Sequence, residues 1–506
     1  MKKIMFLPLD ERPCNYNFAK FMLEGNEEIE LVIPPLEILG RKKEPANFEA
    51  IKEFLLSNAK DCYGVILSID MLLYGGIVPS RLHYFTKEYL CERLSVVRAL
   101  RETNPSIKIF TFALIMRCPQ YSSSDEEPDY YEICGYDIFK YGEIKHKISL
   151  GVASDEEKAE LPSRYEKCKD YFDDYVSRRA INSDMNIEVV KLLHEGIIDF
   201  LVIPQDDSSL YGLIANDQEK IFGPIKEMHL EDKVLIYPGA DEVGMVLVSR
   251  MVNHINGVTP KIYVEYSTEH GHLFVPMFED REVYKTVAKQ IASSGCVLCD
   301  RVEEADGILM MNNPTLELVD ANITEAEHQC DVLKEDVRDI AKFVEKVKSY
   351  VAKGYRVSIA DVALINRADN ELIEEMSRQD IFFELAGYSG WNTSSNTLGT
   401  ALTHLVLNIN YGFTTALEKH LALRIYEDAG YCGHTRKFIT ENRLPELGLG
   451  YFSSGEVKGV VSQMVWDEIN NYIKGAFPQV YEKYMISDCY MPWCRMFEVA
   501  LTVIKR

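Results

Sequence analysis

The sequence lacks an excess of basic charge and any long hydrophobic run. Its 55 Lys and Arg residues are outnumbered by 79 Asp and Glu residues among 506, which gives a formal net charge of −24. Because recognition of nucleic-acid phosphates needs a basic surface, this balance argues against a nucleic-acid partner. No run of about 18 apolar residues occurs, so we expect no membrane-spanning segment and no membrane partner.

Several signatures of common enzyme classes are also missing. The chain has no GxSxG or HExxH motif, and no GxGxxG follows a candidate strand, so we expect no cofactor. Histidines are few, and Glu269-His-Gly-His272 is a weak candidate for metal binding because two His in a Gly-containing loop often arise without a ligand role. We therefore predict no metal site there. The 12 scattered cysteines and an N-terminal apolar run too short for a signal peptide predict a cytoplasmic protein.

The residues that are present predict a folded α/β protein. Short β-branched, near-continuous apolar runs alternate with helical patterns, which is typical of parallel strands buried on both faces. We predict a TIM-type (β/α)8 barrel over residues 1–400, distorted or with a small added α/β part, and a helical C-terminal region over 401–506. The helical patterns predict helices over 87–103, 156–177, 185–195 and 325–352, the first with Thr86 as its N-cap. No internal repeat is visible. The candidate strands are 4–8, 30–33, 65–69, 107–114, 200–204, 234–237, 261–266, 307–311, 357–360 and 382–386.

Polar residues gather directly after these strands, where parallel α/β folds place their catalytic groups. Asp10 and Arg12 follow the first strand, where Arg12 could bind substrate hydroxyls or a carboxylate, or could form an ion pair that fixes the loop. Asp70 ends another strand and precedes Gly75-Gly76 and Arg81. Asp70 and Arg81 could bind substrate or form a structural pair.

Two pairs of adjacent carboxylates are the candidate catalytic groups. Asp206 and Asp207 end a fully apolar strand, just before Tyr211, a candidate substrate contact. Carboxylates this close raise one pKa, as a general acid beside an ionised partner requires; the alternative is a loop-capping or Ca²⁺-like Asp pair. Asp241 and Glu242 follow a Pro-Gly turn, and Asp241 could instead cap the next helix.

A Gly-rich loop over 386–399 supplies neutral contacts for a ligand. Trp391 offers a face on which a sugar ring can stack, and the amides of Asn392 and Asn396 offer hydrogen bonds. The loop has no Walker lysine and is therefore not a P-loop. Asn313 and Asp361 at other strand ends complete the candidate substrate-binding set. We expect the acidic stretch 122–129 to be a solvated loop, and 424–428 to be either a charged surface face or part of the pocket.

The motifs PLDERPCN (8–15), SIDMLLYGGIVPSR (68–81), PQDDSSLYG (204–212), PGADEVG (238–244) and AGYSGWNTSSNTLGTAL (386–402) resemble a bacterial family known only as domain-of-unknown-function family 4127. A second, shorter resemblance links the adjacent Asp pair, the Asn-Pro element and the Trp-Asn loop to β-N-acetylhexosaminidases of the O-GlcNAcase and hyaluronidase type. That resemblance implies a TIM barrel and substrate-assisted catalysis.

The second resemblance also implies roles for individual residues. Asp206 would orient the substrate's 2-acetamido group, and Asp207 would protonate the leaving oxygen. Trp391 with Asn392 would line the sugar pocket. Asn313 would contact the sugar, and Arg12 would bind its hydroxyls.

The leading hypothesis is a glycoside hydrolase that acts on a neutral or N-acetylated sugar or oligosaccharide. Cleavage would be aided by an acetamido group or by a carboxylate nucleophile such as Glu242. One alternative is a hydrolase of phosphate or amide bonds in which several of the aspartates bind Mg²⁺ or Mn²⁺. Another is a non-catalytic carbohydrate-binding protein.

Overall fold

A computed structural model describes residues 1–315 and 331–506, which form two compact units. Unit 1 comprises Met1–Glu11, Asn26–Gly244 and Phe278–Asp280, and unit 2 comprises Arg12–Gly25, Met245–Met277 and Arg281–Arg506. This division differs from the predicted one at residue 400.

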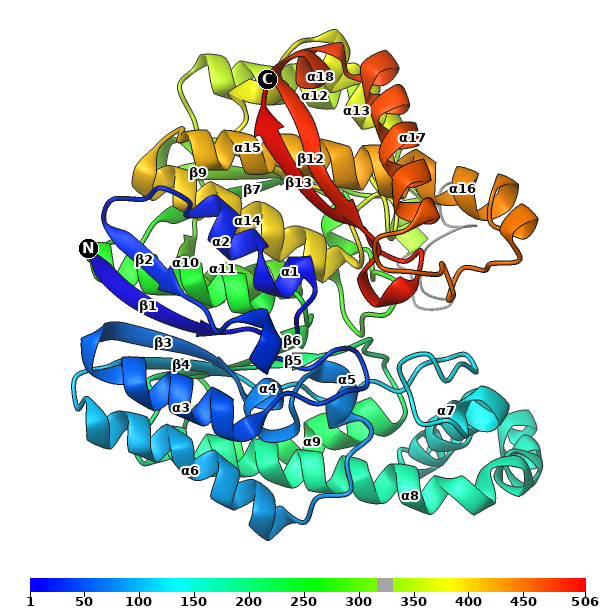
Figure 1. Ribbon diagram of the computed structural model, residues 1–506. Helices are drawn as coiled ribbons and strands as arrows, with labels where there is room; N and C mark the ends of the chain where they lie inside the picture. Colours follow the sequence, from blue (N-terminus) through cyan, green and yellow to red (C-terminus); the bar gives the residue numbers. More distant parts are fainter. Residues whose placement is uncertain (316–330) are drawn as a thin grey trace. The chain divides into compact units, whose positions relative to one another are not determined.

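Unit 1 is built on a six-stranded sheet in which every neighbouring pair of strands is parallel (Figure 1). The spatial order is β2-β1-β3-β4-β5-β6. All six residues of β5 are buried, as the apolar run in the sequence predicts for a strand covered on both faces. The strands are β1 (Lys2–Leu7), β2 (Ile29–Val32), β3 (Cys62–Ser68), β4 (Lys108–Phe112), β5 (Phe200–Gln205) and β6 (Val234–Pro238).

Unit 2 contains a second parallel sheet, with the order β11-β10-β9-β7-β8, and a separate antiparallel pair, β12 and β13. The pair lies within 401–506, so this region is not purely helical. Its first strand alternates buried and less buried residues, as expected of a strand with one face on a core. The strands are β7 (Lys261–Tyr266), β8 (Val297–Leu298), β9 (Gly307–Asn312), β10 (Val357–Asp361), β11 (Gly387–Ser389), β12 (Tyr484–Tyr490) and β13 (Ala500–Lys505).

The two parallel sheets share one strand order, although the sequence shows no repeat. Numbered within its own unit, each sheet runs 2-1-3-4-5, and unit 1 adds a sixth strand at the end. This is an order of doubly wound sheets, in which ligands bind outside the carboxyl ends of the strands, near the point where the strand order reverses. The reversal lies between β1 and β3 in unit 1, and between β7 and β9 in unit 2.

The α/β class with parallel strands is therefore confirmed, but the described residues form no closed barrel. Both sheets are open, with β2 and β6 as the edges of one and β8 and β11 as the edges of the other. Alternating helices and buried strands are common to barrels and to doubly wound sheets. The predicted barrel followed from that shared pattern, which does not encode the order of the strands.

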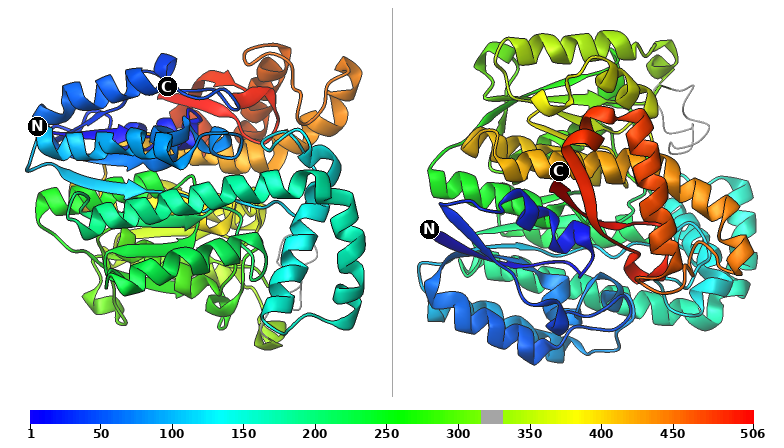
Figure 2. Two further views of the ribbon diagram at one scale, coloured as in Figure 1. Left: turned by 90° about the horizontal axis from the view of Figure 1, so that it is seen from below. Right: turned by 45° about the horizontal axis from the view of Figure 1, so that its top comes forward.

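Helices of unit 1 begin where the sequence offers capping side chains. Thr86 accepts a hydrogen bond from Tyr89 N at the start of α6, and Ser154 forms a capping box with Glu157 at the start of α8. The predicted helices 156–177 and 185–195 are parts of α8. Its first half runs antiparallel to α7, as Figure 2 shows. The helices are α3 (Phe48–Asn58), α4 (Ile69–Tyr74), α5 (Ile77–Ser80), α6 (Lys87–Thr103), α7 (Tyr131–Ser149), α8 (Asp155–His194) and α9 (Leu213–Glu227).

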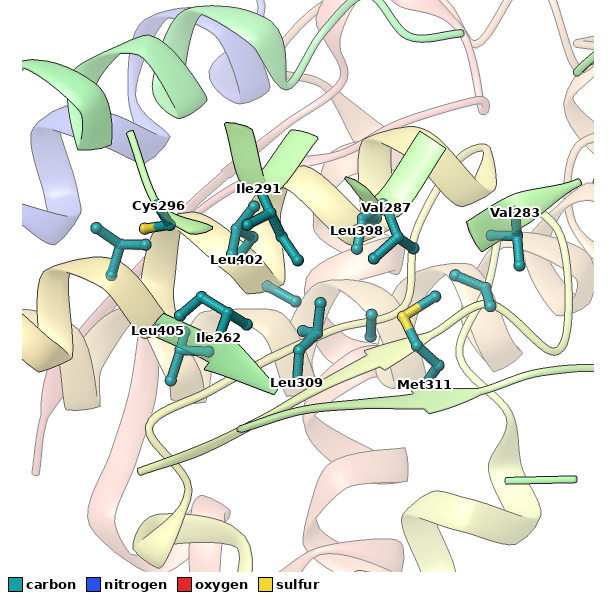
Figure 3. Packing of buried hydrophobic residues seen from close by; sticks show 14 of the residues in the cluster. Ile262, Val283, Val287, Ile291, Cys296, Leu309, Met311, Leu398, Leu402 and Leu405 are labelled. Atoms are coloured by element: carbon teal, nitrogen blue, oxygen red, sulfur yellow. The ribbon is translucent and has the colours of Figure 1, made fainter. Parts of the chain in front are cut away.

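In unit 2, helices α11 (Val283–Ser293) and α14 (Ser394–Tyr411) pack with β7 and β9 around one apolar core (Figure 3). Leu398, Leu402 and Leu405 form one face of α14, at the spacing of a helix side that faces a core. None of the described helices is both long and apolar enough to cross a membrane. The helix predicted over 325–352 starts outside the described residues, and its described part contains α12.

Other helices are short or connect elements. A π-helix over Ile425–Thr435 continues α15 without a break. The remaining helices are α1 (Pro13–Tyr16), α2 (Phe18–Met22), α10 (Val243–Asn256), α11 (Val283–Ser293), α12 (Ile340–Ala352), α13 (Asn370–Arg378), α14 (Ser394–Tyr411), α15 (Thr415–Arg424), α16 (Arg436–Asn442), α17 (Val460–Ala476) and α18 (Pro478–Lys483).

Candidate functional site

The carboxyl ends of β3, β4 and β5 in unit 1 carry a cluster of two arginines and five carboxylates. We call it the Arg81–Arg117 cluster. Its position agrees with the sheet edge at which doubly wound folds bind ligands. Its members are Asp70, Arg81, Arg117, Glu126, Glu127, Asp206 and Asp207.

Arg81 lies at the centre of the cluster and is 1% exposed. Its NH2 group donates to Asp206 Oδ2 at 2.7 Å, and its NH1 group donates to Glu126 Oε2 at 3.0 Å and Glu127 Oε1 at 3.3 Å. The turn that brings Arg81 here depends on Gly75, whose φ is +90°. A Cβ at Gly75 would lie 2.5 Å from Ala46 N, so the turn also depends on a close backbone approach that only glycine permits.

Arg117 follows β4 and repeats this pattern with the other aspartate. Its NH1 group donates to Asp207 Oδ2 at 3.2 Å, its Nε to Glu127 Oε1 at 2.8 Å, and its NH2 lies 3.3 Å from Glu126 Oε2. Glu126 and Glu127 thus bridge the two guanidinium groups. The two adjacent aspartates therefore pair with different arginines, Asp206 with Arg81 and Asp207 with Arg117.

Asp207 has the properties expected of a proton donor. Desolvation, followed by the charge of Asp206, raises the pKa of Asp207 to about 7, against the opposing effect of Arg117 and Arg81. Its backbone has a φ of +45°, a conformation that costs free energy in a residue other than glycine and that is concentrated at functional sites. About a fifth of its side chain is exposed, so a ligand can reach it.

Asp70 is a buried neighbour of this pair. Burial raises its pKa to about 7, although Leu114 N donates to Asp70 Oδ2 at 2.9 Å and lowers it. Asp206 raises the pKa of Asp70 further and Arg81 lowers it, which places Asp70 in the same electrostatic environment. Burial thus shifts two carboxyl groups of the cluster toward their protonated forms.

Three members of the cluster were not predicted from the sequence. Arg117, Glu126 and Glu127 lie in the segment between β4 and α7, and 122–129 was expected to be a solvated loop. Glu127 is instead 1% exposed. Their position in the sequence could have predicted them, because this segment, like the other candidate sites, directly follows the carboxyl end of a strand.

Asp241 and Glu242 form a separate acidic group after β6. Glu242 is fully buried and accepts a hydrogen bond from Ala240 N at 3.0 Å. A Cβ at Gly239 would lie 2.1 Å from Glu242 Oε1, so the turn closes directly on this carboxyl group. Burial raises the pKa of Glu242 to about 8, with smaller contributions from Asp241 and Glu279. This environment is that of a core carboxyl group, and we do not retain Glu242 as a nucleophile.

We expect Glu242→Gln to change stability in a pH-dependent way. A raised pKa means that the stability contributed by the protonated group is complete below about pH 4.5 and is lost as pH rises toward 8, by about 1.4 kcal/mol per pH unit. The variant should therefore gain stability relative to the parent between about pH 5 and 8. Urea unfolding followed by far-UV circular dichroism measures this, and a difference that does not vary with pH would contradict it.

The other predicted residues of unit 1 lie at different positions. Tyr211 packs against α7, with Lys147 Nζ 5.2 Å from its ring centre and His146 in an edge contact. Asp10 is buried at the end of β1, with 2% of its surface exposed.

Arg12 and Asn313, two predicted substrate contacts, lie in unit 2. Arg12 is 5% exposed, pairs with Glu498 at 3.3 Å and stacks over the Trp493 ring at 4.6 Å. Asn313 is fully buried, and its side chain bonds to Ser267 at the switch point between β7 and β9.

The Gly-rich loop before α14 is also in unit 2, and its Trp391 is buried rather than open for stacking. The Trp391 indole donates to Thr400 Oγ1 at 3.1 Å and makes an edge contact with Phe18. Asn392 has a φ of +54°, and Asn396 donates to Thr393 Oγ1 at 3.1 Å. The structure thus uses Trp391 and Asn396 to fix the loop.

Asp361 belongs to a buried polar network at the ends of β9, β10 and β11. It accepts hydrogen bonds from Asn312 Nδ2 at 2.8 Å, Asp369 N at 2.7 Å and Tyr388 OH at 2.9 Å. Burial and the charge of Asp369 raise the pKa of Asp361 to about 7.

The segment 424–428 is not a surface face. Arg424 and Asp428 are fully buried and pair at 3.0 Å, and Asp428 Oδ2 accepts from Gly390 N at 2.8 Å. The pair thereby ties the π-helix to the end of β11. Unit 1 therefore holds Asp10, Asp70, Arg81, Asp206, Asp207, Tyr211, Asp241 and Glu242 of the predicted set, and unit 2 holds Arg12, Asn313, Asp361, Trp391, Asn392 and Asn396.

The described residues do not form a recognisable metal-binding site. No group of three or more His, Cys, Asp and Glu side chains among residues 1–315 and 331–506 is arranged to hold an ion. In the Glu269–His272 segment, His270 Nδ1 lies 2.9 Å from Asp336 Oδ1, and the pKa of His270 is raised by this hydrogen bond.

Comparison with known proteins yields one match. A family model described as "Protein of unknown function (DUF4127)" matches residues 4–502, which is nearly the whole chain. No curated protein and no solved structure matches the sequence or the fold.

Proposed function

The chain belongs to the DUF4127 family of proteins of unknown function, and from its site we propose a glycoside hydrolase in which Asp207 is the general acid. The observation that carries the proposal is the division of the Asp206–Asp207 pair. Asp206 pairs with Arg81 at 2.7 Å, whereas Asp207 pairs with Arg117 at the longer distance of 3.2 Å, is about a fifth exposed, and has a pKa that burial raises to about 7.

This division is what acid-catalysed cleavage of a glycosidic bond requires. One carboxyl group must carry a proton near neutral pH and deliver it to the leaving oxygen. A second carboxylate must remain nearby to stabilise positive charge at the sugar, or to orient a substrate group. Asp207 suits the first role and Asp206 the second.

The resemblance to β-N-acetylhexosaminidases supports this proposal only at the Asp pair. The barrel of that group is not found in the described residues, and Trp391 and Asn392 lie in unit 2. Substrate assistance by an acetamido group therefore rests on Asp206 alone. No group of possible metal ligands among the described residues supports the metal-dependent alternative. The third alternative, a carbohydrate-binding protein without turnover, is distinguished by the experiment below.

A panel of chromogenic glycosides in both anomeric forms tests the proposal. We expect the parent protein to release chromophore from at least one member, and Asp207→Asn to lose that activity. Asp129→Asn is the matched control, because Asp129 lies in the nearby loop with its side chain 99% exposed. Sugar binding without turnover by the parent would identify a binding protein instead.

The pH dependence of turnover follows from the same group. The acid must be protonated to act, and burial raises the pKa of Asp207 to about 7, so kcat/KM should be high below this value and fall above it. A profile of kcat/KM from about pH 5 to 9 measures the alkaline limb. Activity that rises steadily through this range would contradict the assignment of Asp207 as the acid.

A further inference from the structure

Two tyrosine rings on the surface of unit 1 have no role in the proposed mechanism. Tyr84 is 80% exposed, although Arg178 lies over its ring with Cζ 4.9 Å from the ring centre. Tyr171 is 39% exposed, and its ring stacks on that of Tyr130 with the centres 4.8 Å apart and the planes 11° from parallel. Each exposed ring is therefore fixed by a contact on one face and keeps a large accessible surface for a ligand.

Hydrogen bonds join the two rings into one surface, which we call the Tyr84–Tyr171 strip. The guanidinium group of Arg178 donates to Tyr130 OH at 3.4 Å and to Asp174 Oδ2 at 2.9 Å, and Tyr130 OH donates to the same carboxylate at 2.7 Å. Tyr171, Asp174 and Arg178 have the spacing of one face of α8. Seven residues of helix rise by about 10 Å, so the strip is longer than one sugar ring.

The strip begins beside the Arg81–Arg117 cluster. Tyr84 follows Arg81 by three residues, and Tyr130 follows Glu127 by three residues. Three residues reach at most about 11 Å between Cα atoms, even when fully extended. A ligand of several sugar units can therefore contact the strip and the cluster together.

The chemistry of the strip suits a neutral sugar chain. A fixed aromatic ring offers an apolar surface against which the C–H face of a sugar can stack, and the phenolic hydroxyl adds a polar contact. The side chain of Asp174 is 34% exposed and pairs with Arg178, so the strip offers polar atoms but no net charge. We propose that the Tyr84–Tyr171 strip binds a neutral glycan chain. This inference rests on the proposed glycosidase function and narrows its substrate to an oligosaccharide or polysaccharide.

A second protein fits the strip less well. A stable protein interface buries about 800 Å² on each partner and has an apolar centre. The exposed residues of α8 next to Tyr171 are charged, namely Lys169, Asp170 and Asp173. The rings are thus separate aromatic surfaces among charged side chains, which suits successive sugars of a chain better than the continuous apolar centre of a protein interface.

Native electrophoresis through gels that contain a soluble polysaccharide tests the inference without relying on turnover. The probes are hydroxyethylcellulose, arabinoxylan, glucomannan and glycogen. We expect at least one of them to retard the parent protein. Tyr84→Ala and Tyr171→Ala should each lower the affinity for that probe by about two- to tenfold, as the loss of one stacking contact would give. Tyr84→Phe keeps the ring and should restore binding.

Tyr136→Ala is the matched control. Tyr136 is 38% exposed, and Arg164 lies over its ring with Cζ 4.9 Å from the ring centre, so it resembles the strip residues in exposure and contact. Arg164 precedes Arg178 by 14 residues of α8, or about 21 Å along the helix, so Tyr136 lies outside the strip. Its replacement should leave the retardation unchanged.

The outcomes separate this inference from the proposed function. No retardation of the parent by any probe, or equal retardation of the parent, Tyr84→Ala and Tyr171→Ala, would overturn the inference. Chromophore release from small glycosides would then still support a glycosidase. Strip-dependent retardation without release of sugar from the retarding probe or of chromophore from any glycoside would keep the inference and overturn the glycosidase. A dimer in sedimentation velocity that Tyr84→Ala abolishes, without retardation by any probe, would assign the rings to a protein contact and overturn the inference.

Discussion

Replacing Asp207 with asparagine should lower kcat/KM by about 10²- to 10⁴-fold on a glycoside with a poor leaving group. The amide preserves size and can still accept a hydrogen bond from Arg117, whose NH1 lies 3.2 Å from Asp207 Oδ2. It cannot deliver a proton to the departing oxygen. The loss should therefore fall on bond cleavage rather than on folding or binding.

The leaving group separates a general acid from a structural residue. A dinitrophenyl leaving group departs without protonation, so Asp207→Asn should cleave such a glycoside nearly as well as the parent does. The alkaline limb of the pH profile should vanish in the variant. An equal loss on activated and unactivated substrates would show that Asp207 supports the site without acting as its acid.

Replacing Arg81 with methionine should destabilise unit 1 by about 3 to 5 kcal/mol at neutral pH, the usual cost of removing one partner from a buried ionic group. Arg81 is 1% exposed and binds three carboxylates, which would be left close together without their shared cation. The loss should shrink in acid, as those carboxylates become protonated. Urea unfolding followed by far-UV circular dichroism measures the change.

A surface pair of the same unit provides the matched control. Arg98 binds Glu195 at 2.5 Å, but both side chains are more than 40% exposed. Arg98→Met should therefore cost less than about 1 kcal/mol. Trp391, Trp466 and Trp493 all lie in unit 2, so tryptophan fluorescence monitors that unit separately. If Arg81→Met lowered the free energy of unfolding by as little as Arg98→Met, the cluster would contribute little to stability.

Local structure was predictable where a pattern in the sequence has one physical reading. The strand over 261–266 and the helix over 87–103 have the predicted bounds, and Thr86 caps that helix as expected. The apolar run at 382–386 misled, because residues Phe382–Glu384 form a 3₁₀ turn and the strand starts at Gly387. A Cβ at Gly387 would lie 2.6 Å from Ser358 Oγ, so this strand depends on a close approach that its own apolar content does not signal.

The order of the strands and much of the site depend on contacts between distant residues, which a single sequence does not display. Asp206 and Asp207 were predicted because like charges at a strand end have a direct chemical meaning. The pairing of Asp206 with Arg81, itself a predicted site residue, was not, and Arg117 was not predicted at all, since Arg81 is separated from Asp206 by 125 residues and Arg117 from Asp207 by 90. The buried position of Glu127 follows from those same pairings and could not be read from the acidic composition of its loop.

Titration of Asp207 itself is the most direct test of the central claim that this residue is a carboxylic acid near neutral pH. Carbon-13 labelling of aspartate carboxyl groups allows each titration to be followed by NMR, and comparison with Asp207→Asn identifies the signal of Asp207. The account predicts that the variant lacks one titration with a midpoint at about pH 7. Loss of a titration near pH 4 instead, the ordinary range of an exposed aspartate, would contradict the account.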